Sequence, residues 1–183
     1  MATINSSETA PVAVVGRGGT LTARLLRRLV SHPVVELTPC QAALAGGRYR
    51  AVVVENFEPP VPGALSSCAA VRWELSRRTG VTVVGLDDPE GRRLAGTMPG
   101  AVYAYSDGRP QADLTAKNVR LRGERLEFEA LTDKELLRVR VRAGQEPRLY
   151  DHLAALAGAL ALGVPLSEAA ERLGGVDLSG REP

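Results

Sequence analysis

Short apolar runs alternate with amphipathic stretches over the first half of the chain. The runs have the length and composition of strands that are buried on both faces of a sheet. They are residues 11–15, 33–37, 50–55 and 80–86. The stretches between them are typical of helices, at residues 20–31, 41–45 and 64–78. Because strands and helices alternate, the pattern predicts an α/β fold with a doubly wound, mostly parallel sheet of P-loop-like topology.

From residue 101 the period changes to two, with turn sequences between the alternating segments. This predicts antiparallel strands that are added to the edge of the sheet in the second half of the chain. They are residues 101–106, 113–123, 124–131 and 136–144, followed by helices at 148–162 and 167–173. We expect a single domain over residues 11–175, a flexible N-terminus at 1–10 and a linker-like tail at 176–183.

Composition excludes several classes of protein. The 44% hydrophobic and 24% charged residues are typical of a folded globular domain. The net charge of +2, with basic residues spread along the chain and 4% aromatic residues, gives no indication of a nucleic-acid partner. The N-terminus has no hydrophobic signal core, and the most apolar run, 153–166, is too short to span a bilayer. We therefore expect a cytoplasmic protein that does not bind membranes.

Metal and disulfide chemistry have little support in the sequence. The two cysteines, Cys40 and Cys68, lack the spacing of metal ligands, and the two histidines, His32 and His152, lie far apart. We predict that His152 is packed or solvated rather than catalytic, and that the alternating arginines of 138–142 form the solvated face of an edge strand. Asp87 and Asp88 are predicted to form a turn and a helix N-cap before Pro89.

The stretch VAVVGRGGTLTARLLRRLV, residues 12–30, combines a buried strand, a glycine turn and a basic amphipathic helix. Backbone N–H groups at such a junction can converge on a phosphate. The candidate phosphate-binding residues are Gly16, Arg17, Gly18, Gly19 and Thr20. However, the only lysines of the chain are Lys117 and Lys134, so the first half contains none.

Two other interpretations of this turn stay open. It can be a strand–helix connection that binds nothing. It can also belong to a dinucleotide fold, because Glu36 follows Gly16-x-Gly18 at the distance of a ribose ligand, although Leu21 stands where the third glycine belongs.

Four segments together resemble the central domain of the Mur ligases. VTVVGLDDPEGRRLAG is similar to the family's "vvN-x-DDP-x-G-x-x-L" segment, and AVYAYSDGRPQADLTAKNVRLRGERLEFEAL to its following stretch of strands. LYDHLAALAGALALGVPLSEAAERL is similar to its "vyNalAAiAaAlalGi" helix pair, and SGRE to the "GR-x-E" that ends the domain. The order and spacing agree, and the resemblance covers most of the chain from residue 12 onward. It implies descent from ATP-dependent amide-forming ligases of peptidoglycan synthesis.

Carried over residue by residue, the resemblance implies a loop without its catalytic groups. The family loop is "G-T-x-G-K-[ST]-[ST]-T". The lysine that contacts the β- and γ-phosphates corresponds to Thr20, and the hydroxyl that reaches Mg²⁺ corresponds to Leu21. Glu55 matches the family's acidic Mg²⁺ ligand, and Asp151 matches its nucleotide-contacting asparagine.

Other family elements are also replaced. NFEPPVPGALSS, residues 56–67, stands where the family has a longer segment with nucleophile-side contacts. Arg72 or Val71 stands where the family has a lysine that is often carbamylated. We also expect neither the N-terminal UDP-sugar domain nor the C-terminal amino-acid domain of the family in this chain.

The sequence therefore predicts a catalytically inactive Mur ligase-like domain, a pseudoenzyme with a structural, regulatory or protein-interaction role, linked to peptidoglycan or cell-envelope metabolism. We expect no catalytic residues, no cofactor, and a protein partner or a homo-oligomer. The alternatives are a residual nucleotide- or phosphate-binding protein, with Mg²⁺ and ATP as ligands, and a subunit that completes a ligase active site in trans.

Overall fold

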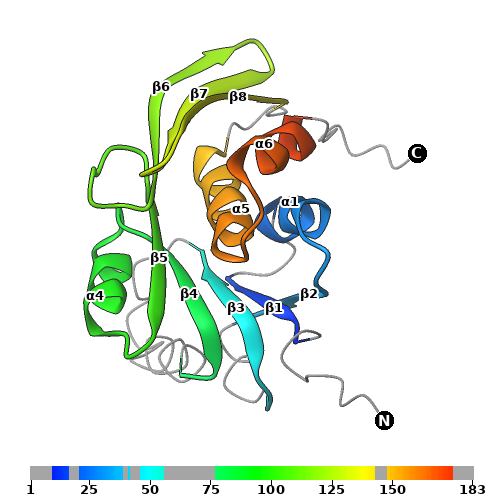
Figure 1. Cartoon of the computed structure of the whole chain (residues 1–183), viewed down its shortest axis with the longest axis vertical. Helices are drawn as coiled ribbons and strands as arrows, with labels where there is room; N and C mark the ends of the chain where they lie inside the picture. Colours follow the sequence, from blue (N-terminus) through cyan, green and yellow to red (C-terminus); the bar gives the residue numbers. More distant parts are fainter. Residues whose placement is uncertain are drawn as a thin grey trace.

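The computed structural model describes residues 10–16, 21–38, 41, 46–55, 77–142 and 148–174. Over these residues one eight-stranded sheet has the order β2-β1-β3-β4-β5-β6-β7-β8 (Figure 1). The strands are β1 (Val12–Val15), β2 (Val34–Leu37), β3 (Tyr49–Val54), β4 (Thr79–Gly85), β5 (Ala101–Ser106), β6 (Leu114–Arg122), β7 (Arg125–Leu131) and β8 (Leu136–Arg142). The helices are α1 (Leu21–Leu29), α4 (Pro89–Thr97), α5 (Leu149–Ala161) and α6 (Leu166–Gly174).

Helices cover both faces of the parallel part of the sheet, as the sequence predicts. Alternate residues of β1 point to opposite faces, so Val12 and Val14 pack with α1, α5 and α6, whereas Ala13 and Val15 pack on the face that α4 covers. All four residues are buried. The predicted α/β fold with a doubly wound, mostly parallel sheet is therefore confirmed.

The strand direction after residue 100 differs in part from the prediction. β5 runs parallel to β4, and β6 begins parallel to β5, so the prediction of antiparallel strands is wrong for residues 101–106 and for the start of β6. The physical reason is α4, which returns the chain to the same end of the sheet before β5 starts. Asp88 caps this helix by accepting a 2.7 Å hydrogen bond from the Glu90 amide, as predicted.

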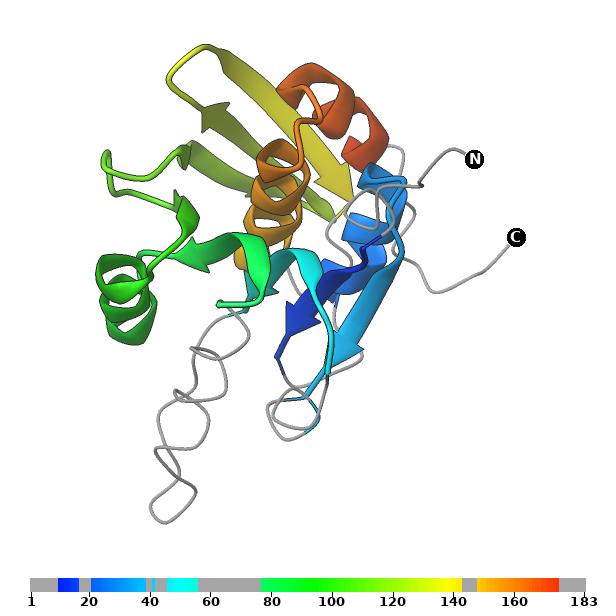
Figure 2. The same ribbon diagram turned by 60° about the horizontal axis from the view of Figure 1, so that its bottom comes forward.

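β6, β7 and β8 form the antiparallel part of the sheet and bend over the helices (Figures 1 and 2). The inward positions, such as Phe128 and Val139, are buried against α5 and α6 in the larger core. The alternating arginines of β8 are exposed, and β8 is the last strand of the sheet order. The prediction of a solvated edge-strand face is confirmed.

Most of the apolar run at 153–166 belongs to α5, in which residues 152–159 are all buried. No helix within the described ranges is long and apolar enough to cross a membrane. The predicted flexible N-terminus and linker-like tail fall almost wholly outside the described residues, as does most of the predicted helix at 64–78, and these stay predictions.

Candidate functional site

The carboxyl ends of the parallel strands bring Gly16 and Glu55 together. Gly16 directly follows β1 and Glu55 directly follows β3, and the Glu55 amide donates a 3.1 Å hydrogen bond to the Val15 carbonyl. A Cβ atom on Gly16 would lie only 1.9 Å from Oε2 of Glu55. The Glu55 carboxylate is therefore folded against the backbone of Gly16.

Asp151 belongs to the same end of the sheet, because α5 begins beside α1. The Thr22 side chain is fully buried, and its Oγ1 donates a 3.1 Å hydrogen bond to Oδ1 of Asp151. The guanidinium of Arg148 lies 3.7 Å from Oδ2 of the same carboxylate. Burial raises the pKa of Asp151, while the Thr22 hydroxyl, Arg148 and His152 oppose that rise.

A buried tyrosine, Tyr105, lies at the end of β5 beside Gly85. Tyr105 is 1% exposed, and its ring packs over Gly85 at the end of β4, where an added Cβ would lie 3.2 Å from the Tyr105 hydroxyl. Burial raises the pKa of Tyr105 far above its ordinary value, and the charges of Glu55, Asp151 and Asp87 raise it further. Burial and these negative charges therefore keep the Tyr105 hydroxyl in its neutral form.

The Asp87 side chain, just after β4, forms hydrogen bonds with residues at the end of β5. Its carboxylate accepts a 2.6 Å hydrogen bond from the Ser106 hydroxyl and a 3.0 Å hydrogen bond from the Asp107 amide. Arg109 lies 3.9 Å from the same carboxylate. The hydroxyl of Tyr150, on α5, donates a 2.9 Å hydrogen bond to Asp107. The predicted turn at Asp87 is present, and its side chain holds the turn.

The structure places three of the predicted site residues, Gly16, Glu55 and Asp151, at one end of the sheet. Arg17, Gly18, Gly19 and Thr20 lie outside the described residues, so their predicted role in phosphate binding stays a prediction. Within the described part of the chain, no group of three or more His, Cys, Asp or Glu side chains is arranged to hold a metal ion. Glu36, the ribose ligand of the dinucleotide alternative, forms an ion pair with Arg27 at 2.6 Å.

Sequence reasoning missed three side chains of this region: Thr22, Ser106 and Tyr150. Each acts through a hydroxyl that bonds an aspartate far away in the sequence, from 19 to 129 positions apart. A lone hydroxyl residue carries no spacing signal, so only the three-dimensional structure identifies these partners.

His152 is fully buried in the first turn of α5. Its Nδ1 lies 2.8 Å from the Arg148 carbonyl, and its Nε2 has no hydrogen-bond partner among the described residues. Burial lowers the pKa of the imidazole, and the Arg148 carbonyl and Asp151 oppose that change. Of the two predicted environments, packed and solvated, the structure shows the packed one.

We expect the free energy of unfolding to fall when the pH drops below about 6.5, the ordinary pKa of histidine. Below this pH the unfolded chain takes up a proton at residue 152, whereas the folded chain keeps the imidazole neutral until its lower pKa is reached. His152 contributes at most about 1.4 kcal/mol per pH unit in this window. Urea unfolding of wild type and His152→Gln between pH 5 and 7.5 measures the effect. An equal slope in both proteins contradicts the prediction.

Of three comparisons with known proteins, the one with solved structures gives matches. Models of known protein families give no match, and curated protein sequences give no significant match. Among solved structures, the UDP-N-acetylmuramoylalanyl-D-glutamyl-2,6-diaminopimelate–D-alanyl-D-alanyl ligase from Acinetobacter baumannii is 17% identical with a TM-score of 0.76, covering 93% of this chain and 46% of that one. A UDP-N-acetylmuramoyl-L-alanyl-D-glutamate–2,6-diaminopimelate ligase is 15% identical with a TM-score of 0.80, covering 92% of this chain and 46% of that one.

A pseudomurein peptide ligase type C from Methanothermus fervidus is also similar, at 14% identity and a TM-score of 0.72, with 93% of this chain and 50% of that one covered. The fold thus defines a class: this chain has a Mur ligase-like α/β fold. It spans about half the length of the ligases that it matches.

Proposed function

We propose that this chain is a Mur ligase-like domain without ATP-dependent ligase activity, and that it has a structural, regulatory or protein-interaction role. The observation that carries the proposal is the hydrogen bond from the buried Thr22 hydroxyl to Asp151. Thr22 lies at the start of α1 and Asp151 at the start of α5, the positions that the resemblance assigns to the loop hydroxyls and to a nucleotide contact. The two side chains thus form a hydrogen bond with each other, which supports a structural role for both.

The charges at this end of the sheet also support the proposal. A ligase of this type must place a triphosphate against a carboxylate, with metal ions and positive side chains that balance the negative charge. Here Glu55 is folded against Gly16, and the charges of Glu55, Asp151 and Asp87 all act on the Tyr105 hydroxyl. Leu21 supplies no hydroxyl for Mg²⁺. The positions of the phosphate-contacting lysine and of the Mg²⁺-contacting hydroxyl thus hold Thr20 and Leu21, which supports a domain without phosphoryl transfer.

The proposed biological setting is peptidoglycan or cell-envelope metabolism. The support is the fold that the chain shares with the muramoyl peptide ligases and with the pseudomurein peptide ligase described above. A non-catalytic domain of this fold can act there by binding a protein of the same process. We further propose that it acts in the cytoplasm, where nucleotide-linked precursors are available.

An amide-formation assay tests the proposal. The purified chain is incubated with ATP, Mg²⁺, a UDP-N-acetylmuramoyl peptide and the corresponding amino acid or dipeptide, beside an active ligase of the same fold as a positive control. We expect no ADP and no new amide bond above the level of the enzyme-free reaction. ADP formation in equal amount with a new amide, detected by mass spectrometry, contradicts the proposal.

A further inference from the structure

The outer face of β6, β7 and β8 carries a row of three arginines. In the strand register Arg122 lies opposite Arg125, and Arg125 lies opposite Arg142, so the three residues stand side by side on neighbouring strands next to the β6–β7 turn. All three are exposed. We call these three residues the arginine row. Like charges that lie directly opposite on neighbouring strands destabilise a sheet.

The next two rows of the same face are arranged differently, because each has a glutamate between two basic residues. These rows are Arg120, Glu127, Arg140 and Lys117, Glu129, Arg138. Glu127 lies 3.4 Å from Arg140, and Glu129 lies 3.6 Å from Arg138. In the arginine row the central position, on β7, is Arg125 instead of a glutamate.

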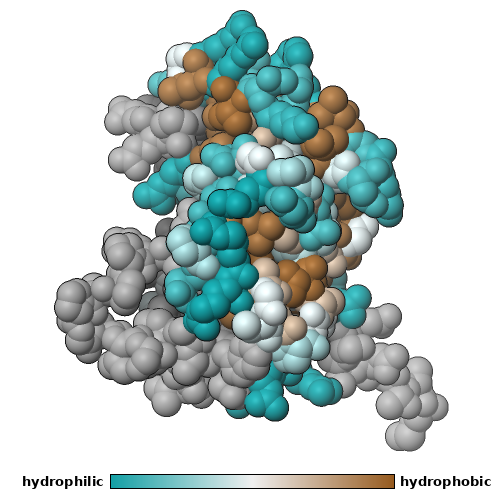
Figure 3. Space-filling model, turned by 90° about the vertical axis from the view of Figure 1, so that its left-hand side faces the viewer, coloured by the Kyte–Doolittle hydropathy of each residue, from teal (hydrophilic) through white to brown (hydrophobic). Residues whose placement is uncertain are grey.

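The three rows together concentrate positive charge on one face of the molecule. Their nine positions hold seven basic and two acidic residues, whereas the whole chain has a net charge of only +2. Hydrophilic side chains cover most of the described upper part of one side of the molecule in Figure 3, with apolar side chains between them. A groove of about 240 Å³ runs along this face, and Arg120, Arg122, Arg138 and Arg140 are among its lining residues.

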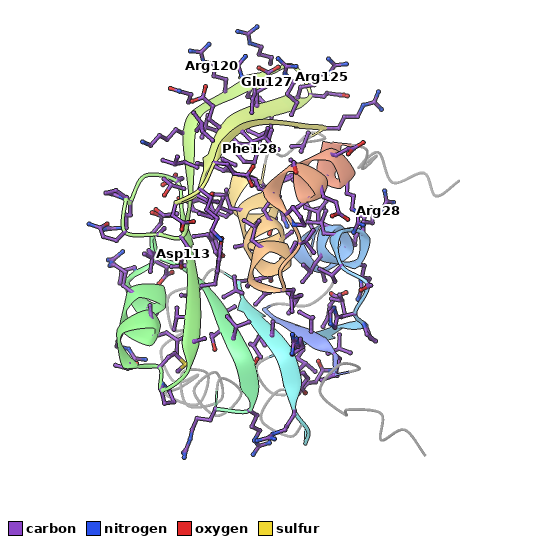
Figure 4. All side chains as sticks on the ribbon, in the orientation of Figure 1. Arg28, Asp113, Arg120, Arg125, Glu127 and Phe128 are labelled. Carbon is purple, nitrogen blue, oxygen red and sulfur yellow. The ribbon has the colours of Figure 1, made fainter. Side chains whose placement is uncertain are left out.

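The end of the hairpin is accessible from both sides. Figure 4 places Arg120, Arg125 and Glu127 at the far end of the strands, while Phe128 lies on the side of α5 and α6. Leu121 belongs to the same side as Phe128, yet it is 53% exposed because the hairpin extends beyond these helices. A partner can therefore reach the arginine row without displacing any described part of the chain.

We propose that the arginine row binds an acidic helix of a partner protein, with carboxylates three or four residues apart. Neighbouring strands are about 4.8 Å apart, and side chains at i and i+4 of a helix are about 5–6 Å apart. Carboxylates on one helix face therefore match arginines on successive strands. Same-side residues of an extended peptide are about 6.7 Å apart and match less well. Arginine also forms bidentate hydrogen bonds with a carboxylate.

The same face does not favour a nucleic acid. Sequence-independent binding of single strands depends on aromatic side chains on which bases stack. The aromatic residue of these three strands, Phe128, points into the core, and Glu127 and Glu129 stand in the middle of the face. The inference rests on the protein-interaction role proposed above, but it uses a face that is separate from the Gly16, Glu55 and Asp151 region.

The test compares two double charge reversals that change the net charge equally. Arg122→Glu/Arg125→Glu removes the arginine row, whereas Arg24→Glu/Arg28→Glu changes two exposed arginines of α1, where Figure 4 labels Arg28. The probe is a labelled, end-capped alanine-based peptide of about 16 residues with glutamate at every fourth position. A peptide of the same composition with its glutamates in one block, and an oligothymidylate, are measured in parallel by fluorescence anisotropy at low salt.

We expect the spaced peptide to bind more tightly than the block peptide, with a loss of about tenfold or more in Arg122→Glu/Arg125→Glu. The reversal on α1 is expected to change the affinity less than about twofold. The single variant Arg125→Glu places a carboxylate between two arginines, and we expect it to raise Tm by about 1–3 °C while it weakens peptide binding.

Four results would overturn the inference: no binding of the spaced peptide, equal losses in the two double variants, tighter binding of the oligothymidylate, or self-association of the chain that the double reversal abolishes. None of them affects the amide-formation assay. Conversely, ligase activity would overturn the proposed function and leave the binding result in place, so the two failures are distinguishable.

Discussion

Replacing Asp87 with alanine is expected to lower the free energy of unfolding by about 2–3 kcal/mol. Its carboxylate accepts hydrogen bonds from the Ser106 hydroxyl and the Asp107 amide, and its side chain is only 22% exposed. The alanine variant leaves both donors without this acceptor. It therefore removes the side-chain link between the ends of β4 and β5. For a domain of this size, we expect Tm to fall by about 5–9 °C in a thermal unfolding scan.

Two further variants distinguish the contribution of the Asp87 hydrogen bonds from that of the neighbouring helix N-cap. Asp87→Asn keeps one acceptor oxygen, so it is expected to lose about half as much stability as the alanine variant. Asp88→Ala removes the bond to the Glu90 amide and is expected to cost about 1 kcal/mol, the usual value of an N-cap. If Asp87→Ala is no more destabilising than Asp88→Ala, Asp87 does not hold the strand ends as described.

The second large effect is expected at Gly158, in the middle of α5. A Cβ atom there would lie 3.0 Å from Cγ2 of Val53 and 3.1 Å from Cδ1 of Leu26. The missing side chain lets α5 approach β3 and α1 closely. Gly158→Val adds three carbon atoms to this filled space, and we expect it to lower the free energy of unfolding by about 2–3 kcal/mol in urea unfolding.

Alanine substitutions provide the matched controls. Gly158→Ala is expected to be nearly neutral, because the gain of about 1 kcal/mol in helix propensity offsets the cost of the tight contacts with Val53 and Leu26. Gly96→Ala places the same group on α4 with no atom within 4 Å, and we expect it to stabilise the fold by about 0.5–1 kcal/mol. Equal effects of Gly158→Val and Gly158→Ala would contradict the close packing of α5.

The parallel half of the fold could be predicted because its strands are buried on both faces. Continuous apolar runs such as 11–15 are rare outside that environment, and the alternation with helices indicates the topology. The direction of β5 could not be predicted from its alternating pattern, because a strand at the margin of a parallel sheet has the same period as an antiparallel one. The helix α4 decides the direction, and its short length weakens its signal in the sequence.

The candidate site was predictable where a residue follows a strand or matches a family motif. Gly16 was predicted from the glycine turn after an apolar strand, whereas Glu55 and Asp151 were predicted from the resemblance to the Mur ligases. Gly16 and Glu55 lie together because the carboxyl ends of parallel strands meet at one edge of the sheet. The hydroxyl partners of Asp151 and Asp87 were not predicted, because each comes from a distant element. The basic face was missed for a similar reason: arginines that are spread along the sequence become neighbours only when β6, β7 and β8 pair.

The residue that gives the expected pH response, His152, lies next to Asp151, which accepts the Thr22 hydrogen bond at the start of α5. Both residues are in the first helical turn. Burial raises the pKa of Asp151 and lowers the pKa of His152, so it disfavours the charged form of each. At this helix start Asp151 accepts a hydrogen bond from the buried Thr22 hydroxyl, which joins α5 to α1.

Calorimetric titration of the chain with ATP and Mg²⁺ tests the central claim most directly. The claim is that the Gly16, Glu55 and Asp151 region no longer holds a magnesium-bound triphosphate. We predict no binding heat beyond dilution up to millimolar ATP, and the same result with ADP. Binding of ATP in the micromolar range that requires Mg²⁺, and that Glu55→Ala or Asp151→Ala weakens, would contradict it.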